Sequence, residues 1–95
     1  GLLVSSINEE LKEKFNIPNS VQGVIVLNVE TNSDASKKGI LPGDIISEVS
    51  QNQIFSPLDL QNRLQEEIKA SRDFALLLIN RKGNLSYIAV KINKN

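Results

Sequence analysis

The sequence holds few side chains that could do covalent or acid–base chemistry. It contains no His, no Cys and no Met, which excludes a Ser-His-Asp triad, a Cys-His pair, a His-containing metal site and a thioether ligand. Its carboxylate pairs, Glu9-Glu10 and Glu66-Glu67, are adjacent residues of expected helices. Adjacent helical residues diverge by about 100° and do not face one another, so these pairs are solvated charges. We therefore expect no catalytic residues, no metal site and no enzymatic activity of this chain itself.

No motif in the sequence predicts a cofactor or a nucleic acid. The glycines fit neither the dinucleotide fingerprint nor the Walker spacing. Eleven basic residues balance eleven acidic ones, and no basic run exceeds the two residues of Lys37-Lys38 or Arg81-Lys82. A nucleic-acid-binding surface needs a basic patch, which is missing. We read the two basic pairs as a helix C-terminus and an exposed turn, where cations are common without a ligand.

Length and composition predict one domain over residues 1–95. The chain has 95 residues, 40% of them hydrophobic, and a chain of this size buries roughly 60–65% of its unfolded surface. The longest apolar stretch, 74–79, is far shorter than the ~20 residues that span a bilayer, so we expect no membrane insertion. The chain starts directly in an apolar run, residues 1–4, which suggests a piece of a longer protein.

Hydrophobic patterning predicts an α+β domain with the element order β-α-β-α-β-α-β-β. Val- and Ile-rich or alternating runs predict strands over 2–7, 22–30, 45–49, 74–80 and 85–92, and a tight connection at 51–52 allows an extra bridge at 53–54. Capping residues predict helix starts at Asn8, Ser33 and Ser56.

Local signals also predict turns and one helix face. Pro42 and Gly43 suit the two central positions of a type II turn, and Gly83 suits a hairpin connection over 81–84. In the last helix an apolar stripe recurs at i, i+4 and i+8, formed by Leu60, Leu64 and Ile68.

A module without chemical groups can still recognise a polypeptide if an unpaired strand edge lies beside a helix with apolar flank positions. The first strand offers Leu2, Leu3, Val4 and Ser5. The long helix offers three residues that flank its core stripe at similar helical angles, namely Pro57, Gln61 and Leu64. The residues alone leave a simpler alternative open, in which both elements only pack on the core.

One segment of the chain resembles a known family. Residues 23–46 read G-V-I-V-x(6)-S-x-A-x-x-x-G-I-L-P-G-D-I-I, which resembles the central signature of bacterial PDZ domains. The likeness continues in order through the long helix and the L-L-L-I-N-R-K-G-N hairpin. The opening G-L-L-V-S-S-I-N-E-E-L is similar to the circularly permuted PDZ domains of proteases. The chain most resembles the second, C-terminal PDZ domain of periplasmic serine proteases of the HtrA (DegP/DegQ) type.

The resemblance implies a partly open β-sandwich or barrel of five to six strands, with two main helices and one short one. It also implies that a peptide C-terminus adds as a strand beside the first strand and the long helix. Leu2, Leu3, Val4 and Ser5 would pair with this ligand, and Pro57, Gln61 and Leu64 would line the facing wall. Gly1 and Leu2 would end the loop whose backbone N–H groups hold the terminal carboxylate. The residues Gly39, Pro42, Gly43 and Asp44 would serve the fold.

The family further implies a non-catalytic, periplasmic module that binds polypeptide C-termini or unfolded substrates and regulates a serine protease in protein quality control. The alternative is an interdomain docking module, which would assemble the protease oligomer through residues 9–14 or the turn at 81–84. Membrane-embedded and tail-specific proteases remain alternative carriers of such a domain.

Overall fold

The computed structural model describes residues 1–92, and its frame is a six-stranded antiparallel sheet. The strands run in the spatial order β1-β2-β3-β5-β6, and the short β4 pairs with β3. This order leaves β1 and β6 as the two edge strands of the main path. The strands are β1 (Leu2–Ser6), β2 (Val24–Val29), β3 (Ile45–Val49), β4 (Asn52–Gln53), β5 (Phe74–Arg81) and β6 (Asn84–Lys91).

Three helices connect these strands: α1 (Glu9–Phe15), α2 (Asp34–Lys37) and α3 (Pro57–Lys69). The three predicted capping residues are confirmed, because the side chains of Asn8, Ser33 and Ser56 each accept a hydrogen bond from the backbone N–H three residues later. The structure is thus a small α+β domain with six strands and three helices, in agreement with the expected fold class.

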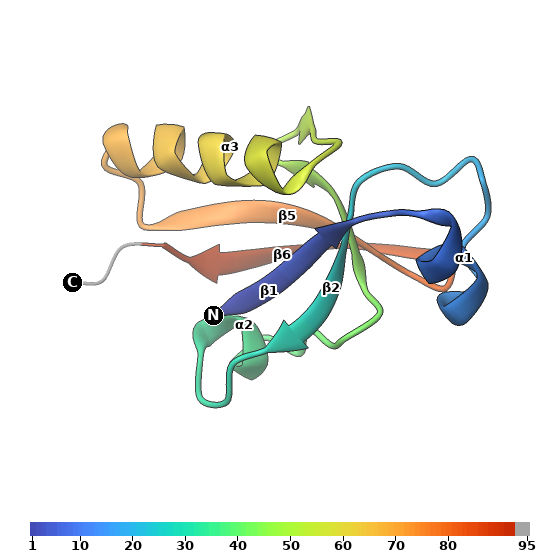
Figure 1. Ribbon diagram of the computed structural model, residues 1–95. Coiled ribbons are helices and arrows are strands. Elements are labelled where there is room, and N and C mark those ends of the chain that lie inside the picture. Colours follow the sequence, from blue (N-terminus) through green and yellow to red (C-terminus); the bar gives the residue numbers. More distant parts are fainter. Residues whose placement is uncertain (93–95) are drawn as a thin grey trace.

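The buried side chains form two clusters. The larger one joins β2, β3, β5 and β6 to α2 and α3, around fully buried residues such as Ile46, Ile54 and Leu77. The smaller one lies where α1 packs, around Ile17, Ile25 and Ile45. Figure 1 shows the consequence: α3 lies along β5 on one face of the sheet, while α1 stands at the opposite end of the domain.

The connection between β3 and β4 differs from the predicted one by a residue. Its central residues are Ser50 and Gln51, with φ of 49° and 68°, and Val49 pairs with Asn52. Two consecutive positive φ values define a two-residue hairpin turn that usually contains Gly or Asn. Neither residue type is present at 50–51, so nothing in the sequence signalled this turn. The predicted bridge at 53–54 therefore lies one residue later than β4 (Asn52–Gln53).

The predicted apolar stripe of α3 is correct only in part. Leu60 is buried and Leu64 packs against the larger cluster, but Ile68 is 46% exposed. At 3.6 residues per turn, a residue eight positions on is rotated by about 80° from the first. Ile68 therefore lies on the flank of α3 and not on its core face.

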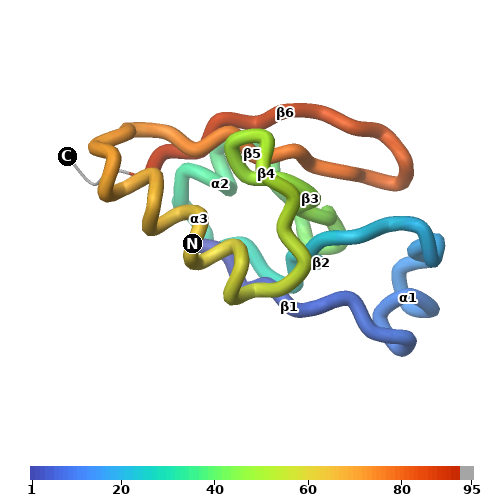
Figure 2. The backbone as a smooth tube through the Cα atoms, turned by 90° about the horizontal axis from the view of Figure 1, so that it is seen from above, coloured from blue at the N-terminus to red at the C-terminus, as the bar shows by residue number. Residues whose placement is uncertain are grey.

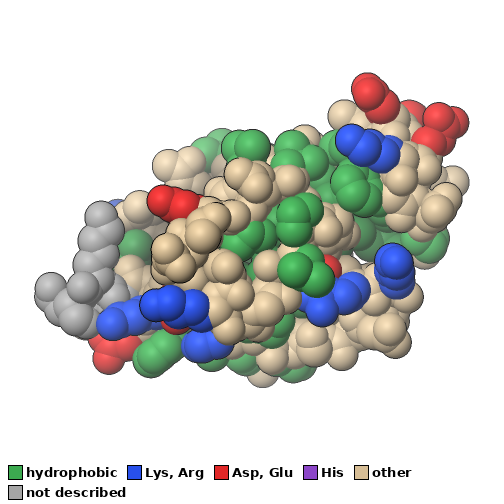
Figure 3. Space-filling view, turned by 90° about the horizontal axis from the view of Figure 1, so that it is seen from below, with side chains coloured by type: hydrophobic (Ala, Val, Ile, Leu, Met, Phe, Trp, Pro, Cys, Tyr) green, Lys and Arg blue, Asp and Glu red, His purple; other side chains and the backbone are tan. Residues whose placement is uncertain are grey.

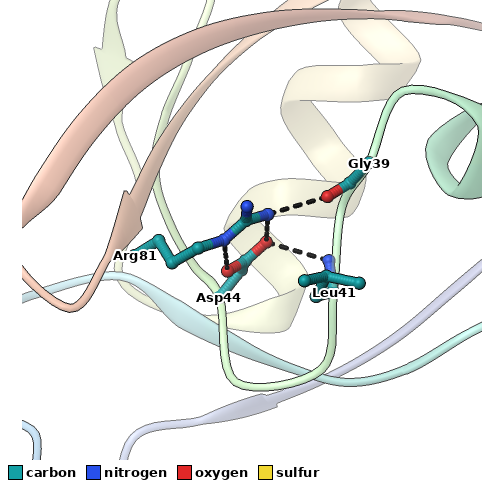
Figure 4. Close-up of polar contacts among 4 residues, drawn as sticks. All are labelled: Gly39, Leu41, Asp44 and Arg81. Carbon is teal, nitrogen blue, oxygen red and sulfur yellow. Dashed lines mark hydrogen bonds and ion pairs between the residues drawn. The ribbon is translucent and has the colours of Figure 1, made fainter.

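The Leu41–Asp44 turn is held by an ion pair with β5. Asp44 is only 2% exposed, and its two carboxylate oxygens accept hydrogen bonds from Nε and Nη2 of Arg81, each at 2.7 Å. The carboxylate also accepts from the backbone N–H of Leu41 at 2.9 Å, and Arg81 Nη2 donates to the carbonyl of Gly39. Figure 4 shows this network. The hydrogen bonds that Arg81 donates to the Asp44 carboxylate raise the pKa of Arg81. Arg81 therefore has a structural partner, whereas the sequence suggested only an exposed cation of the turn.

Candidate functional site

Among residues 1–92, β1 is an edge strand that pairs with β2 alone. Val4 pairs with Val26 of β2. The N–H of Val26 donates to the Asp44 carbonyl, and its C=O accepts from the Gly43 N–H, so both groups point away from β1. Backbone groups of antiparallel strands alternate in direction, so those of Val4 point away from β2. The same alternation turns the groups of Leu2 and Ser6 outward. Within residues 1–92, the outward backbone groups of Leu2 and Val4 have no hydrogen-bond partner, whereas the Ser6 carbonyl accepts from the Ser5 hydroxyl.

The start of the free edge of β1 is fixed by Gly1. Its carbonyl oxygen accepts a hydrogen bond from the N–H of Glu30 at 2.7 Å, which extends the pairing with β2 by one residue. Gly1 therefore faces β2, and the N–H of Leu2 lies on the free side. A hollow of about 250 Å³ lies where the start of β1 meets the end of β2, lined by Gly1, Leu2, Leu3, Asn28 and Glu30.

The side chains of β1 divide between the core and the surface. Leu2 and Val4 are half-buried and pack against the larger cluster. Leu3 is 59% exposed, and the hydroxyl of Ser5 donates to the carbonyl of Ser6 at 3.0 Å. Of the four predicted strand residues, Leu3 is the one with a large free apolar side chain.

α3 lies beside β1, and the two elements are in contact. The tube in Figure 2 shows the first turns of α3 passing close to β1. Pro57 occupies the first helical position after the Ser56 cap, and the Asp59 carboxylate accepts from the N–H of Phe55, which fixes the direction of the helix start. The predicted strand and helix residues are therefore carried by neighbouring elements.

The predicted wall residues lie on one side of α3 and differ in exposure. Pro57 and Leu64 are half-buried and Gln61 is exposed. Ile68 continues the same spacing, at 57, 61, 64 and 68, and is exposed. It is the wall candidate that sequence reasoning missed, because its i+8 relation to Leu60 suggested a core position.

The described part of the chain holds no metal-binding chemistry. Within residues 1–92 no three carboxylate, imidazole or thiol groups gather as a metal site would need. None of the helices in the same range has the length and apolarity that a bilayer crossing requires.

A family model for the PDZ domain matches residues 1–92. The chain is a PDZ domain. The family is a non-catalytic one, in agreement with the prediction that this chain carries no active site. Because the match covers every described residue, β1 and α3 both lie within the PDZ domain.

The chain is similar to curated proteins that are described as DegP-like proteases. A probable periplasmic serine endoprotease from Chlamydia pneumoniae is 28% identical over 91 residues, covering 96% of this chain and 18% of the relative. One from Hahella chejuensis is 30% identical over 94 residues, covering 99% and 19%. The chain therefore spans about a fifth of the length of these curated relatives.

Solved PDZ domains share the fold. The HtrA3 PDZ domain bound to a phage-derived ligand (FGRWV) superposes with a TM-score of 0.75, at 24% identity, covering 96% of this chain and 80% of that one. The HtrA-type protease AlgW, solved with a decapeptide, gives a TM-score of 0.75 at 20% identity, covering 96% and 27%. The predicted PDZ architecture is confirmed by these likenesses.

Proposed function

We propose that this domain binds an extended polypeptide segment by strand addition to the free edge of β1, beside α3. The observation that carries the proposal is the orientation of the backbone at Leu2 and Val4, whose N–H and C=O groups point away from β2. Such groups pair readily with an added strand. The HtrA3 PDZ domain was solved bound to a phage-derived ligand (FGRWV), and the protease AlgW was solved with a decapeptide, which supports a peptide as the partner.

The site has three parts in this proposal. Leu2, Leu3, Val4 and Ser5 pair with the backbone of the ligand, and the outward N–H of Leu2, next to Gly1, lies where a terminal carboxylate is bound. The exposed Leu3 covers one side of the ligand. The flank of α3 receives its side chains, through Pro57, Gln61, Leu64 and Ile68.

The wider role follows from the relatives. We propose that the chain is one module of a longer HtrA-type serine protease and corresponds to its second PDZ domain. In that setting it regulates the protease and recruits C-termini or unfolded substrates in the periplasm, the compartment named for the DegP-like relatives. The protease activity belongs to a part of the protein outside this chain.

A titration with a five-residue apolar peptide carrying a free C-terminal carboxylate tests the binding site, with backbone amide NMR shifts as the readout. We expect a dissociation constant on the order of micromolar and shifts at 2–6 and along α3. The amidated peptide should bind about tenfold more weakly, because it lacks the charge that the outward amides hold.

Paired variants sharpen this test. Ile68→Ser removes an apolar wall contact and should weaken binding several-fold, whereas Leu85→Ser, on β6, should leave it unchanged. Leu85 is also an exposed leucine, 63% accessible, which makes it a matched control. Shifts confined to residues outside β1 and α3 would rule out this site.

A second candidate function is docking to another domain or subunit of the same protease. It is favoured by the cavity next to the β5–β6 turn, because Arg81, Lys82 and Gly83 of the turn expected to make such contacts line it. The other expected surface, residues 9–14, does not line this cavity. Deleting the domain from the full-length protein and measuring particle size by light scattering separates the functions. Smaller particles would support docking, and unchanged particles with weaker substrate recruitment would support the β1 edge.

A further inference from the structure

A cavity of about 840 Å³ lies between the end of α1, the Leu41–Asp44 turn and the β5–β6 turn. Figure 1 shows α1 and the β5–β6 turn at the end of the domain away from the N-terminus. No residue of β1 lines the cavity, so it is separate from the β1 edge. Its volume is within the range of roughly 300–1,000 Å³ that is typical of ligand sites. Most of its lining is apolar, formed by Phe15, Ile17, Pro18, Val21, Leu41 and Pro42.

Much of this apolar lining is open to solvent. Leu41 is 51% exposed, and the side chains of Phe15 and Val21 are half-buried. Figure 3 shows hydrophobic side chains gathering on the lower face toward this end, with Lys and Arg side chains beside them. An apolar surface of this kind with a polar border is typical of a binding site.

The ionisable groups that line the cavity leave a positive charge on its rim. They are Asp44, Arg81 and Lys82. Asp44 is fully engaged by Arg81 and the backbone, so the pair is neutral and Lys82 is left with its charge. The α1 carboxylates Glu10 and Glu13 are exposed and do not line the cavity.

Arg81 also has donors to spare. Its three hydrogen bonds use Nε and Nη2, and the side chain is 44% exposed. The two N–H groups of Nη1 are therefore outside this network, as the unbonded guanidinium nitrogen in Figure 4 shows. From α1, the Lys14 ammonium lies 5.6 Å from the centre of the Phe15 ring and adds positive charge nearby.

We propose that this cavity is a second polypeptide-binding site, which takes a bulky apolar side chain of an extended segment from another protein or domain. A carboxylate next to that side chain in the segment bonds Nη1 of Arg81 and pairs with Lys82. The apolar floor and the cationic rim together select this combination, since an apolar group alone would leave the rim donors unused. The site uses none of the residues assigned to peptide addition at β1.

The probe is a peptide with both ends blocked, acetyl-Ala-Asp-Leu-Phe-Ala-amide, together with its counterpart that has Asn in place of Asp. Blocking removes the terminal carboxylate that the β1 site would hold. In an amide NMR titration we expect shifts at residues around the cavity and a dissociation constant on the order of 0.1–1 mM. The Asn peptide should bind about fivefold more weakly, because it lacks the charge.

Two variants with matched controls complete the test. Lys82→Glu should weaken binding of the Asp peptide about tenfold, while Lys69→Glu, an exposed lysine of α3, should change it less than about twofold. Leu41→Ser should weaken binding, and Leu85→Ser should not. Lys82, Leu41 and both control residues are exposed, so all four variants are expected to fold, which urea unfolding verifies.

Three results would overturn the proposal. The first is equal affinity for the Asp and Asn peptides, and the second is amide shifts at β1 in place of the cavity. The third is amide shifts at the cavity that depend on protein concentration alone, which would mean that a second copy of the chain fills it. Peptide addition at β1 is tested separately, with a peptide that has a free carboxylate and with the amide shifts of β1 and α3 as the readout. One proposal can therefore fail while the other holds.

Discussion

Gly23 shows how one residue of the central motif fixes the sheet. Its φ is 134°, and a Cβ at this position would collide with the backbone carbonyl oxygen of Ile46 on the neighbouring strand. Backbone cannot yield as a flexible side chain does, so β2 and β3 approach closely here only because Gly has no side chain. The sequence motif predicted a glycine at this position, and the structure identifies the Ile46 carbonyl oxygen as the atom that a side chain would meet.

We expect Gly23→Ala to lower the free energy of unfolding by about 3 kcal/mol or more, because it adds a backbone clash to the cost of a positive φ. Gly39→Ala is the control. Gly39 also has a positive φ, 87°, but a Cβ there would meet nothing within 4 Å, so its cost should be about 1 kcal/mol. Urea unfolding of both variants measures the difference, and equal losses would contradict the close approach.

The Arg81–Asp44 pair makes a second prediction at this scale. Arg81→Ala leaves the buried Asp44 carboxylate with the Leu41 N–H alone, and we expect a loss of about 2 kcal/mol, reduced from that of a fully buried pair because Arg81 is partly exposed. Lys82→Ala, at the adjacent position, should cost less than about 0.5 kcal/mol. Thermal unfolding compares the two, and a neutral Arg81→Ala would show that the pair does not stabilise the fold.

At the scale of elements, α2 and the Lys38 that follows it cover the C-terminal part of the second sheet edge. The Asp34 carboxylate accepts from the N–H of Lys91 at 2.7 Å, and the Lys38 ammonium donates to the carbonyl of Ala89 at 2.8 Å. Both β6 groups point outward, so a four-residue helix blocks the part of the edge nearest the C-terminal end of β6. This protection distinguishes β6 from β1, because the outward groups of Leu2 and Val4 have no such partner within residues 1–92.

The hydrogen bond from Lys91 lowers the pKa of Asp34 below its ordinary value of 3.8. A lowered folded-state pKa contributes stability that is present above the unfolded-state pKa and is lost as the pH falls through the folded-state pKa. We expect wild type to be more stable than Asp34→Asn by a constant amount from pH 7 to about pH 4, and the difference to vanish at lower pH. Urea unfolding across this range measures the difference, and a pH-independent Asp34→Asn difference would contradict the assignment.

The two faces of α3 give a further contrast. Leu60→Ala should cost about 3 kcal/mol because it leaves a cavity in the larger cluster, whereas Ile68→Ala should cost less than about 1 kcal/mol because Ile68 is 46% exposed. Urea unfolding measures both. Similar losses would place Ile68 in the core after all and remove it from the proposed ligand wall.

Local chemistry determined how well each element could be predicted. The helix starts were predictable because Asn8, Ser33 and Ser56 bond backbone N–H groups within three residues of themselves. The Ser50-Gln51 turn was not, since its positive φ values are imposed by the pairing of β3 with β4. For the site, sequence placed the strand and the helix flank but could not tell that Leu2 and Val4 turn their side chains inward, nor that Arg81 bonds a residue 37 positions away.

At the scale of the whole molecule, the two proposed binding surfaces lie at separate places. Figure 1 shows β1 starting at the N-terminus and α1 with the β5–β6 turn at the other end, where the cavity is lined. In our proposals, this separation would let one domain hold a polypeptide end on β1 while a segment of a second partner occupies the cavity. The sheet joins the two places through β2 and β3, which contribute to both core clusters.

Amide hydrogen exchange along β1, with and without a free-carboxylate peptide, tests strand addition most directly. The amides of Leu3 and Ser5 face β2, so we expect them to be protected already in the free domain, whereas those of Leu2, Val4 and Ser6 face outward and should exchange fast. Peptide binding should slow Leu2 and Val4 and leave Leu3 and Ser5 unchanged. Fast exchange at Leu2 and Val4 in a domain saturated with peptide would contradict strand addition at this edge.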